Sequence, residues 1–266
     1  MTRLLLLGNS HAAALRPALR RLAEGRDDLA CHFWGLPGAT FAKVIQHGDG
    51  HLRLPPGDRF AQRKSLQWQV SPEIDPRPFD HILLVGLRFH HRLLVQLLGR
   101  LWAWDWGMPP KRGDGLAFHP VSLRFVEAVI AQEIATTLAN QMARIPLDHR
   151  VILMPAPYSA SATIQGGALY EAATAALALH PMAAQLQEIF ESALQTTAQA
   201  QGLRLCLQPR DTIAAPWLSD DSYLALPDQD GRHLNDAYGQ IALGAMARLI
   251  GLDSGPMGQP CPRIQP

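Results

Sequence analysis

The 266-residue sequence has few of the features that mark a disulfide-bonded, zinc-binding or membrane-spanning protein. Its three cysteines, Cys31, Cys206 and Cys261, are far apart and form no Cys-X-X-Cys pair, which argues against a disulfide framework or a zinc site. The N-terminal leucine run, residues 4–7, is too short for the apolar core of a signal peptide. No segment approaches the roughly 20 apolar residues that a membrane span needs. We therefore expect a soluble, cytoplasmic protein.

Net charge is also nearly absent. Lys and Arg number 24 and Asp and Glu number 23, which leaves a charge of +1 with His neutral. Such a chain has no overall field that would attract nucleic acid or an anionic membrane surface, so we expect neither as a partner. With 47% hydrophobic residues, a chain of this length can bury a full core without disulfides or a metal.

What the sequence does contain is a series of short apolar runs, each followed by a turn and a helical pattern. Continuous apolar runs are typical of strands that are buried on both faces. They lie at residues 3–7, 29–35, 79–86, 150–154 and 202–209. Helical patterns follow at about 14–22, 91–102, 120–144, 168–201 and 233–251, the fourth being one helix or two broken at Pro181. This alternation predicts an α/β fold: a doubly wound, flavodoxin-like five-stranded parallel sheet with helices on both faces.

The absence of internal repeats favours a single domain over residues 1–251, with insertions at about 46–78 and 101–118. The first insertion is polar and rich in Gly, Pro and Arg, and it is interpreted as a long loop. Residues 252–266 form a tail rich in Pro and Gly, expected to be loosely held. Because ligands of such folds bind at the carboxyl ends of the strands, the loops after residues 7, 35, 86 and 154 should carry the chemistry.

The first of these loops reads Gly8-Asn9-Ser10-His11, at the start of a helical pattern. Backbone N–H groups at a helix N-terminus have no partner within the helix, and the helix dipole favours negative charge there. A serine hydroxyl at this place would attack beside donors able to hold an oxyanion. The alternative is that Asn and Ser, which are both preferred N-cap residues, only cap the helix.

A second motif, Asp230-Gly-Arg-His233, stands just before the C-terminal helix. A catalytic histidine needs a carboxylate that holds its imidazole in one tautomer, and two residues three apart in a turn would be close enough for that contact. The alternative is an ordinary surface histidine before a helix. Together the two motifs, with nearly the whole domain between them, resemble the SGNH (GDSL-type) hydrolase superfamily.

The resemblance implies a serine hydrolase with Ser10 as nucleophile, His233 as base and Asp230 as the residue that orients it. It implies an acyl-enzyme intermediate and no cofactor or metal. The oxyanion hole would be formed by the N–H groups of Ser10 and Gly38, with Gly35 as the rival of Gly38. Arg88 stands where the family has an asparagine, so this donor would be a guanidinium, able to serve an oxyanion or an anionic group of the substrate.

Four further residues are expected to contact the substrate. Asn9 and His11 flank the nucleophile, and His90 and Tyr158 follow the third and fourth strands, where we expect the rim of the active site. His90 and His91 form a pair that suggests a metal, but no Asp, Glu or Cys completes a ligand set at useful spacing.

Three tryptophans alternate in the segment Trp102-Ala-Trp104-Asp-Trp106. On an extended segment they would share one face and suit stacking on a sugar ring or lining an acyl site. Burial against the core is the alternative that we favour.

The sequence therefore predicts an esterase that cleaves a small acyl ester, with an O-acetyl group on a carbohydrate or another polar metabolite as a candidate substrate. An O-acyltransferase with the same triad is one alternative. A non-catalytic member of the fold that binds an anion or a carbohydrate is the other.

Overall fold

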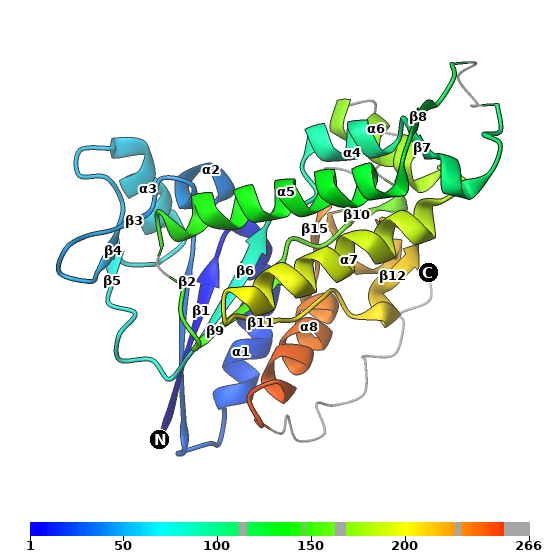
Figure 1. Ribbon diagram of the computed structural model, residues 1–266. Coiled ribbons are helices and arrows are strands. Elements are labelled where there is room, and N and C mark those ends of the chain that lie inside the picture. The colour runs from blue at the N-terminus through cyan, green and yellow to red at the C-terminus, as the bar shows by residue number, and fades with distance from the viewer. Residues whose placement is uncertain (112–115, 146, 163–168, 227–229, 253–266) are drawn as a thin grey trace.

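The computed structural model describes residues 1–111, 116–145, 147–162, 169–226 and 230–252. Its centre is a parallel sheet in the order β11-β9-β6-β1-β2, drawn in Figure 1. These strands are β1 Thr2–Gly8, β2 Leu29–Gly35, β6 His81–Leu87, β9 Val151–Pro155 and β11 Arg204–Leu205. Counted along the chain, the spatial order is 2-1-3-4-5, which is the flavodoxin-like order. The five-stranded parallel sheet predicted from the apolar runs is therefore confirmed.

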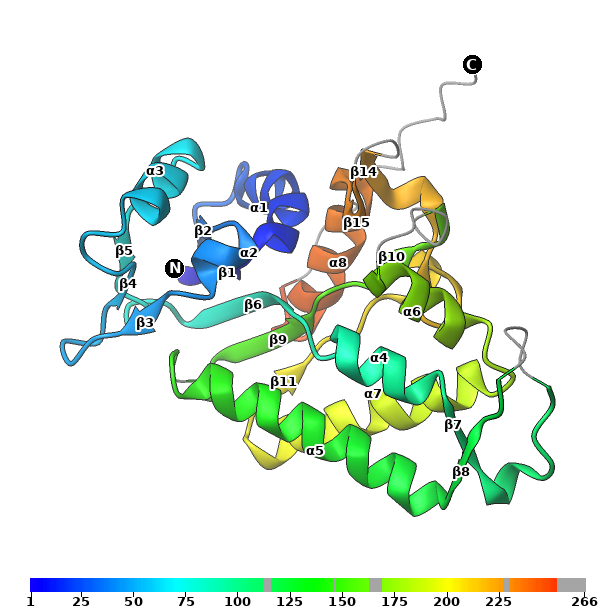
Figure 2. The same cartoon turned by 90° about the horizontal axis from the view of Figure 1, so that it is seen from above.

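Helices cover both faces of this sheet, as Figure 2 shows. One face carries α1 (Arg16–Ala23) and α8 (Asp236–Arg248), and the other carries α5 (Leu123–Met142) and α7 (Ala183–Ala200). The run of four leucines in β1 is explained by this arrangement. Leu4 and Leu6 pack in the cluster beneath α1 and α8, whereas Leu5 and Leu7 pack in the cluster beneath α5 and α7. Both faces of the strand are buried, so the run is continuous and does not alternate.

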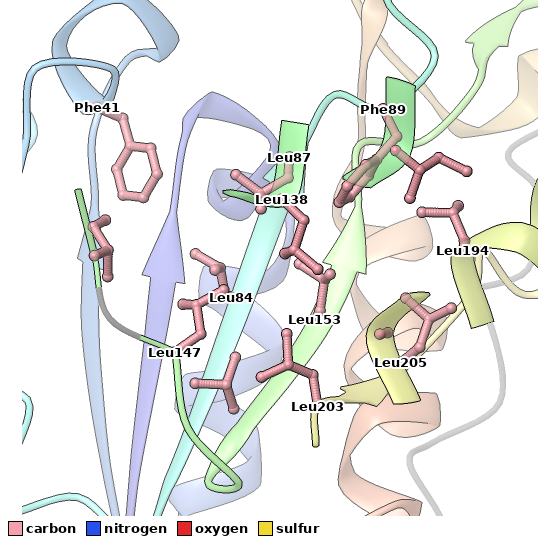
Figure 3. Packing of buried hydrophobic residues seen from close by; sticks show 14 of the residues in the cluster. Phe41, Leu84, Leu87, Phe89, Leu138, Leu147, Leu153, Leu194, Leu203 and Leu205 are labelled. Atoms are coloured by element: carbon pink, nitrogen blue, oxygen red, sulfur yellow. The ribbon is translucent and has the colours of Figure 1, made fainter. Parts of the chain in front are cut away.

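The larger of the two apolar clusters lies between the sheet and the α5–α7 layer. Figure 3 shows Leu84 from β6 and Leu153 from β9 in this layer, with Leu194 of α7 nearby. Burial of leucines of this kind stabilises the fold by roughly 2 kcal/mol each. The core thus fixes the strands whose carboxyl ends carry the candidate site.

The first insertion is not the loop that the sequence predicted. It contains a three-stranded antiparallel sheet in the order β3-β4-β5 and one helix, α3. Their bounds are β3 Ile45–Gln46, β4 Leu52–Arg53, α3 Arg59–Gln67 and β5 Glu73–Ile74. Leu52, Ala61 and Ile74 are buried in the larger apolar cluster, so the insertion is part of the core. Strands of two residues are too short to show a period in the sequence.

The helical pattern predicted over residues 91–102 is wrong at its C-terminal end. Helix α4 (Arg92–Leu98) ends before the tryptophans, and the chain continues as β7 (Leu101–Ala103), which pairs with β8 (His119–Val121). Trp102 in β7 is buried, whereas Trp104, in a 3-10 turn, is 67% exposed. The three rings therefore do not form one face. For Trp102, burial against the core, the alternative that we favoured, is what the structure shows.

The remaining elements complete the description of the chain. They are α2 Gly38–Phe41, β10 Ser159–Ala160, α6 Leu169–Ala178, β12 Ile213–Ala215, β13 Leu218–Ser219, β14 Leu224–Leu226 and β15 Asp230–Leu234. The pattern over 168–201 is thus two helices, separated around Pro181. Within the described residues, no helix is long and apolar enough to cross a membrane. Most of the predicted tail, with Cys261, lies outside the described residues, and the single-domain boundary at residue 251 stays a prediction.

Candidate active site

The Gly8-Asn9-Ser10 turn lies at the point where the strand order of the sheet reverses. Strand β1 pairs with β2 on one side and with β6 on the other, and the chain leaves β1 between their carboxyl ends. This switch point is where open α/β sheets bind ligands. Ser10 begins a short 3-10 helix, Ser10–Leu15, so its N–H has no acceptor within that helix.

The side chain of Asn9 fixes this turn in place. Its Oδ1 accepts a hydrogen bond from the N–H of His11 at 3.0 Å, and its Nδ2 donates to the carbonyl oxygen of Gly86 at 2.5 Å. Gly86 has φ of +97°, and a Cβ there would lie 2.0 Å from Asn9 Oδ1. Both ends of the Asn9 amide are therefore engaged with the chain. We expected Asn9 to contact the substrate, but the structure places it as the link between the β1 turn and β6.

His233 lies against Ser10 although 223 residues separate them in the chain. Its Nε2 is 2.8 Å from Ser10 Oγ, a hydrogen-bond distance. His233 comes from β15, which pairs with β14 and leads directly into α8. Helix α8 can approach the serine turn because Gly239 has no side chain, and a Cβ there would lie 1.7 Å from the Ala14 carbonyl oxygen.

The predicted third member of the triad is only partly described. Asp230 begins the strand β15, so the segment from Asp230 to His233 is extended and is not the turn that the sequence suggested. The carboxylate of Asp230 lies outside the part of the chain whose side chains the structure describes. For His233 Nε2 to accept the serine proton, its Nδ1 must carry a proton, which a carboxylate or carbonyl oxygen would then accept.

The candidate oxyanion donors lie at or after the carboxyl ends of β2 and β6, the strands on either side of β1. Gly38 begins α2 just after β2 ends, and a Cβ there would meet nothing within 4 Å. Its rival Gly35 is the last residue of β2, paired with Gly8, and the ring of Phe33 occupies the place of a Cβ there. Arg88 is exposed and directly follows β6. The geometry thus favours Gly38 over Gly35 as the residue that faces open space.

His11 packs on the base. Its side chain is 6% exposed, and its ring centroid lies 5.2 Å from that of His233 at an interplanar angle of 34°. His11 also lines the cleft beside Ser10. Of the four residues expected to contact the substrate, it is the one that the structure brings to both the nucleophile and the base.

His90 and Tyr158 do not lie at the rim of the site, which corrects our expectation. They are 4% and 5% exposed, and their rings pack together with centroids 5.2 Å apart. Burial lowers the pKa of His90 to about 3, with the charge of Arg88 as a smaller cause, so the imidazole is neutral. The Tyr158 hydroxyl donates to Glu191 Oε1 at 3.1 Å, and burial raises its pKa well above the ordinary value. Both rings belong to the core.

A cleft of about 700 Å³ opens beside Ser10 and His233. Two of its lining residues, Trp68 and Asp236, were not anticipated from the sequence. Trp68 stands in the polar insertion that we interpreted as a loop, and Asp236 looks like an ordinary first-turn acid of a helix. The one available signal was the large aromatic residue within an otherwise polar segment.

The described side chains offer no metal site. No three His, Cys, Asp or Glu residues among them gather closely enough to hold an ion.

Comparison with known proteins gives only distant likenesses. No family model matches the chain, and the search of curated proteins finds no match. Among solved structures it is similar to LAE5, an alpha/beta hydrolase from the metagenome of Lake Arreo, with 14% identity, a TM-score of 0.36 and coverage of 96% of this chain and 97% of that one. It is also similar to the catalytic domain of Streptococcus pneumoniae peptidoglycan O-acetyltransferase A, with 12% identity, a TM-score of 0.34 and coverage of 94% and 93%.

A third likeness is to an extracellular lipase from Streptomyces rimosus, with 11% identity, a TM-score of 0.39 and coverage of 95% of this chain and 98% of that one. All three proteins carry the names of hydrolases, acetyltransferases or lipases. Similarities with TM-scores below 0.5 do not support an assignment of function. Any assignment has to be argued from the geometry of the switch point.

Proposed function

We propose that the protein is a serine esterase that cleaves a small acyl ester, with Ser10 as nucleophile and His233 as general base. The observation that carries this proposal is the 2.8 Å distance between Ser10 Oγ and His233 Nε2 at the switch point of the sheet. A nucleophile and base within hydrogen-bond reach, beside unpaired backbone donors, form the arrangement that acyl transfer needs.

In the first half-reaction His233 Nε2 takes the proton of Ser10 while Oγ bonds to the ester carbonyl carbon. The carbonyl oxygen becomes an oxyanion that the N–H groups of Ser10 and Gly38 stabilise, with the exposed guanidinium of Arg88 as a further donor. The C–O bond to the alcohol then breaks, and His233 returns the proton to the leaving oxygen. The products are an acyl-serine and a free alcohol.

In the second half-reaction a water molecule gives a proton to His233 Nε2 while its oxygen bonds to the acyl carbon. The bond between the acyl carbon and Ser10 Oγ then breaks, and His233 returns the proton to Oγ, which releases the acid and restores Ser10. In our proposal an acceptor oxygen at His233 Nδ1, the role that the resemblance assigns to Asp230, stabilises the imidazolium formed in both halves. A second alcohol in the place of water would make the protein an O-acyltransferase through the same steps.

Labelling with a fluorophosphonate probe tests the nucleophile directly. We expect the probe to attach to Ser10, and we expect both labelling and hydrolysis of p-nitrophenyl acetate to be lost in Ser10→Ala. Ser192→Ala removes an exposed serine of α7 and should leave both unchanged. Undiminished turnover by Ser10→Ala would disprove the proposal.

The same experiment separates the alternatives. If Ser10 reacts with the probe and unlabelled protein transfers the acyl group to added alcohols faster than to water, the protein would be an acyltransferase. Absence of labelling, with a folded chain, would favour a binding protein in which the exposed Arg88 holds an anion at the carboxyl end of β6.

A further inference from the structure

The cleft beside Ser10 has an unusual wall. Trp68 lies at the end of α3, in the insertion of residues 46–78, and this half-buried residue lines the same cavity as Ser10 and His233. Four alanines line the same cavity and leave it wide: Ala13, Ala14, Ala225 and Ala237. A volume of about 700 Å³ lies within the usual range of small-molecule sites, and it is far larger than an acetyl group needs.

The backbone holds Trp68 firmly at this wall. Its carbonyl oxygen accepts a hydrogen bond from Arg16 Nη1 at 3.3 Å, which ties the end of α3 to α1. The next residue, Gln69, has φ of +54°, a left-handed conformation that costs a non-glycine residue roughly 1–2 kcal/mol. The N–H of Val70 closes the turn by donating to the Ser65 carbonyl oxygen at 3.0 Å. The backbone is therefore strained at Gln69, the residue that follows Trp68.

The wall of the cleft also contains a carboxylate. Asp236 is the first residue of α8, three residues after His233, and it is exposed at the cleft. Asn235 already caps the helix, since its Oδ1 accepts from the N–H groups of Ala237 and Tyr238. The Asp236 carboxylate is therefore not needed as the cap.

We infer that Trp68 and Asp236 form a subsite for the alcohol part of the substrate, and that this alcohol is a carbohydrate ring. A sugar ring presents an apolar C–H face, which packs on an aromatic ring, and hydroxyl groups at its edge, which donate to a carboxylate. The inference rests on the proposed function, because it assigns the alcohol that leaves when Ser10 is acylated. An aliphatic alcohol would use the aromatic wall but not the carboxylate.

The test compares two acetyl esters that differ in the alcohol alone: methyl 6-O-acetyl-glucopyranoside and vinyl acetate, which has no ring. The measured quantity is the ratio of their kcat/KM values, followed by acetate release. We expect Trp68→Ala to lower this ratio about 10-fold and Trp68→Phe to lower it less, because phenylalanine keeps an aromatic face. Asp236→Asn should lower it about 5-fold, since hydrogen bonds to a neutral amide are weaker.

Trp104→Ala is the matched control, because it removes an exposed tryptophan that does not line the cleft, and the ratio should not change. An unchanged ratio in Trp68→Ala would overturn the inference while the esterase proposal stands. Saturation-transfer NMR with the Ser10→Ala variant tests the case in which the subsite exists but the protein is not an esterase. Binding of the acetylated glucoside that is lost on adding Trp68→Ala would support the subsite even if the wild-type protein cleaves no ester.

Discussion

Replacing Gly86 with alanine is a sharp test of how the active-site turn is held together. The new Cβ would lie 2.0 Å from Asn9 Oδ1, more than 1 Å closer than ordinary contact. Forcing the two apart costs about 2 kcal/mol, as overpacking does. The φ of +97° adds strain of about 2 kcal/mol for a residue with a side chain. We therefore expect Gly86→Ala to lower the free energy of unfolding by about 4 kcal/mol.

Asn9→Ala removes the other partner of this contact. It loses the hydrogen bond to the His11 N–H, a capping interaction of about 1 kcal/mol, and the hydrogen bond to the Gly86 carbonyl oxygen, about 1 kcal/mol more. In the double variant the clash is absent, and only the backbone strain and the lost hydrogen bonds remain. The double variant should therefore be destabilised by about 4 kcal/mol, where additivity of the single variants would give about 6 kcal/mol.

Urea unfolding followed by tryptophan fluorescence measures all four free energies. Gly25→Ala provides the matched pair, because Gly25 has φ of +71° but no atom within 4 Å of its Cβ position. Its effect should add to that of Asn9→Ala. If the Gly86 and Asn9 effects also add within about 0.5 kcal/mol, the contact does not hold the turn and the reasoning is refuted.

Three other predictions concern the packing of the fold. Gly239→Ala should destabilise by about 1–3 kcal/mol, because its Cβ would meet backbone atoms, whereas the exposed Gly48→Ala should be neutral in the same urea experiment. His90 has its pKa lowered to about 3 in the fold, so the unfolded chain binds one more proton than the folded chain between about pH 6.5 and 3. Stability should fall across that window as pH falls, and His90→Leu should make the slope shallower by about 1.4 kcal/mol per pH unit; an unchanged slope would contradict the burial. Arg210→Met should cost about 2 kcal/mol because it leaves the buried Glu191 carboxylate without its ion pair, and adding Glu191→Gln should recover part of that loss in thermal unfolding.

The central strands β1, β6 and β9 were predictable because nearly all of their residues are buried. Strands covered on both faces are continuous apolar runs. The run of leucines in β1 therefore identifies a strand even when the strands that pair with it are unknown. The same physics failed in the first insertion. There the strands β3, β4 and β5 have two residues each, and their pairing depends on contacts that no local pattern records.

The candidate site was predictable only in part. The switch-point rule directed attention to the turn at Ser10, and the resemblance linked it to His233. His90 and Tyr158 were placed at the rim because each follows a central strand. Their burial depends on distant partners, since His90 packs against Phe190 and Tyr158 packs against Trp217. The burial of a polar residue by distant elements cannot be recognised from its local sequence.

At three glycines, neighbouring parts of the chain approach each other closely, and these approaches form the frame of the site. In the sequence they are visible only as glycine residues. Gly8 lies against the Val85 carbonyl oxygen, Gly86 lies against Asn9, and Gly239 lies against the Ala14 carbonyl oxygen. Each approach joins a different pair of elements around Ser10: β1 to β6, β6 to the serine turn, and α8 to the 3-10 helix. Gly8 and Gly239 face backbone atoms, which cannot change rotamer to relieve a clash, so these two contacts define the spacing of the site more strictly than side-chain packing does. Gly86 faces the side-chain amide of Asn9, which its own two hydrogen bonds hold in place. The short distance between Ser10 and His233 therefore depends on glycines, which let the elements that carry these two residues come close together.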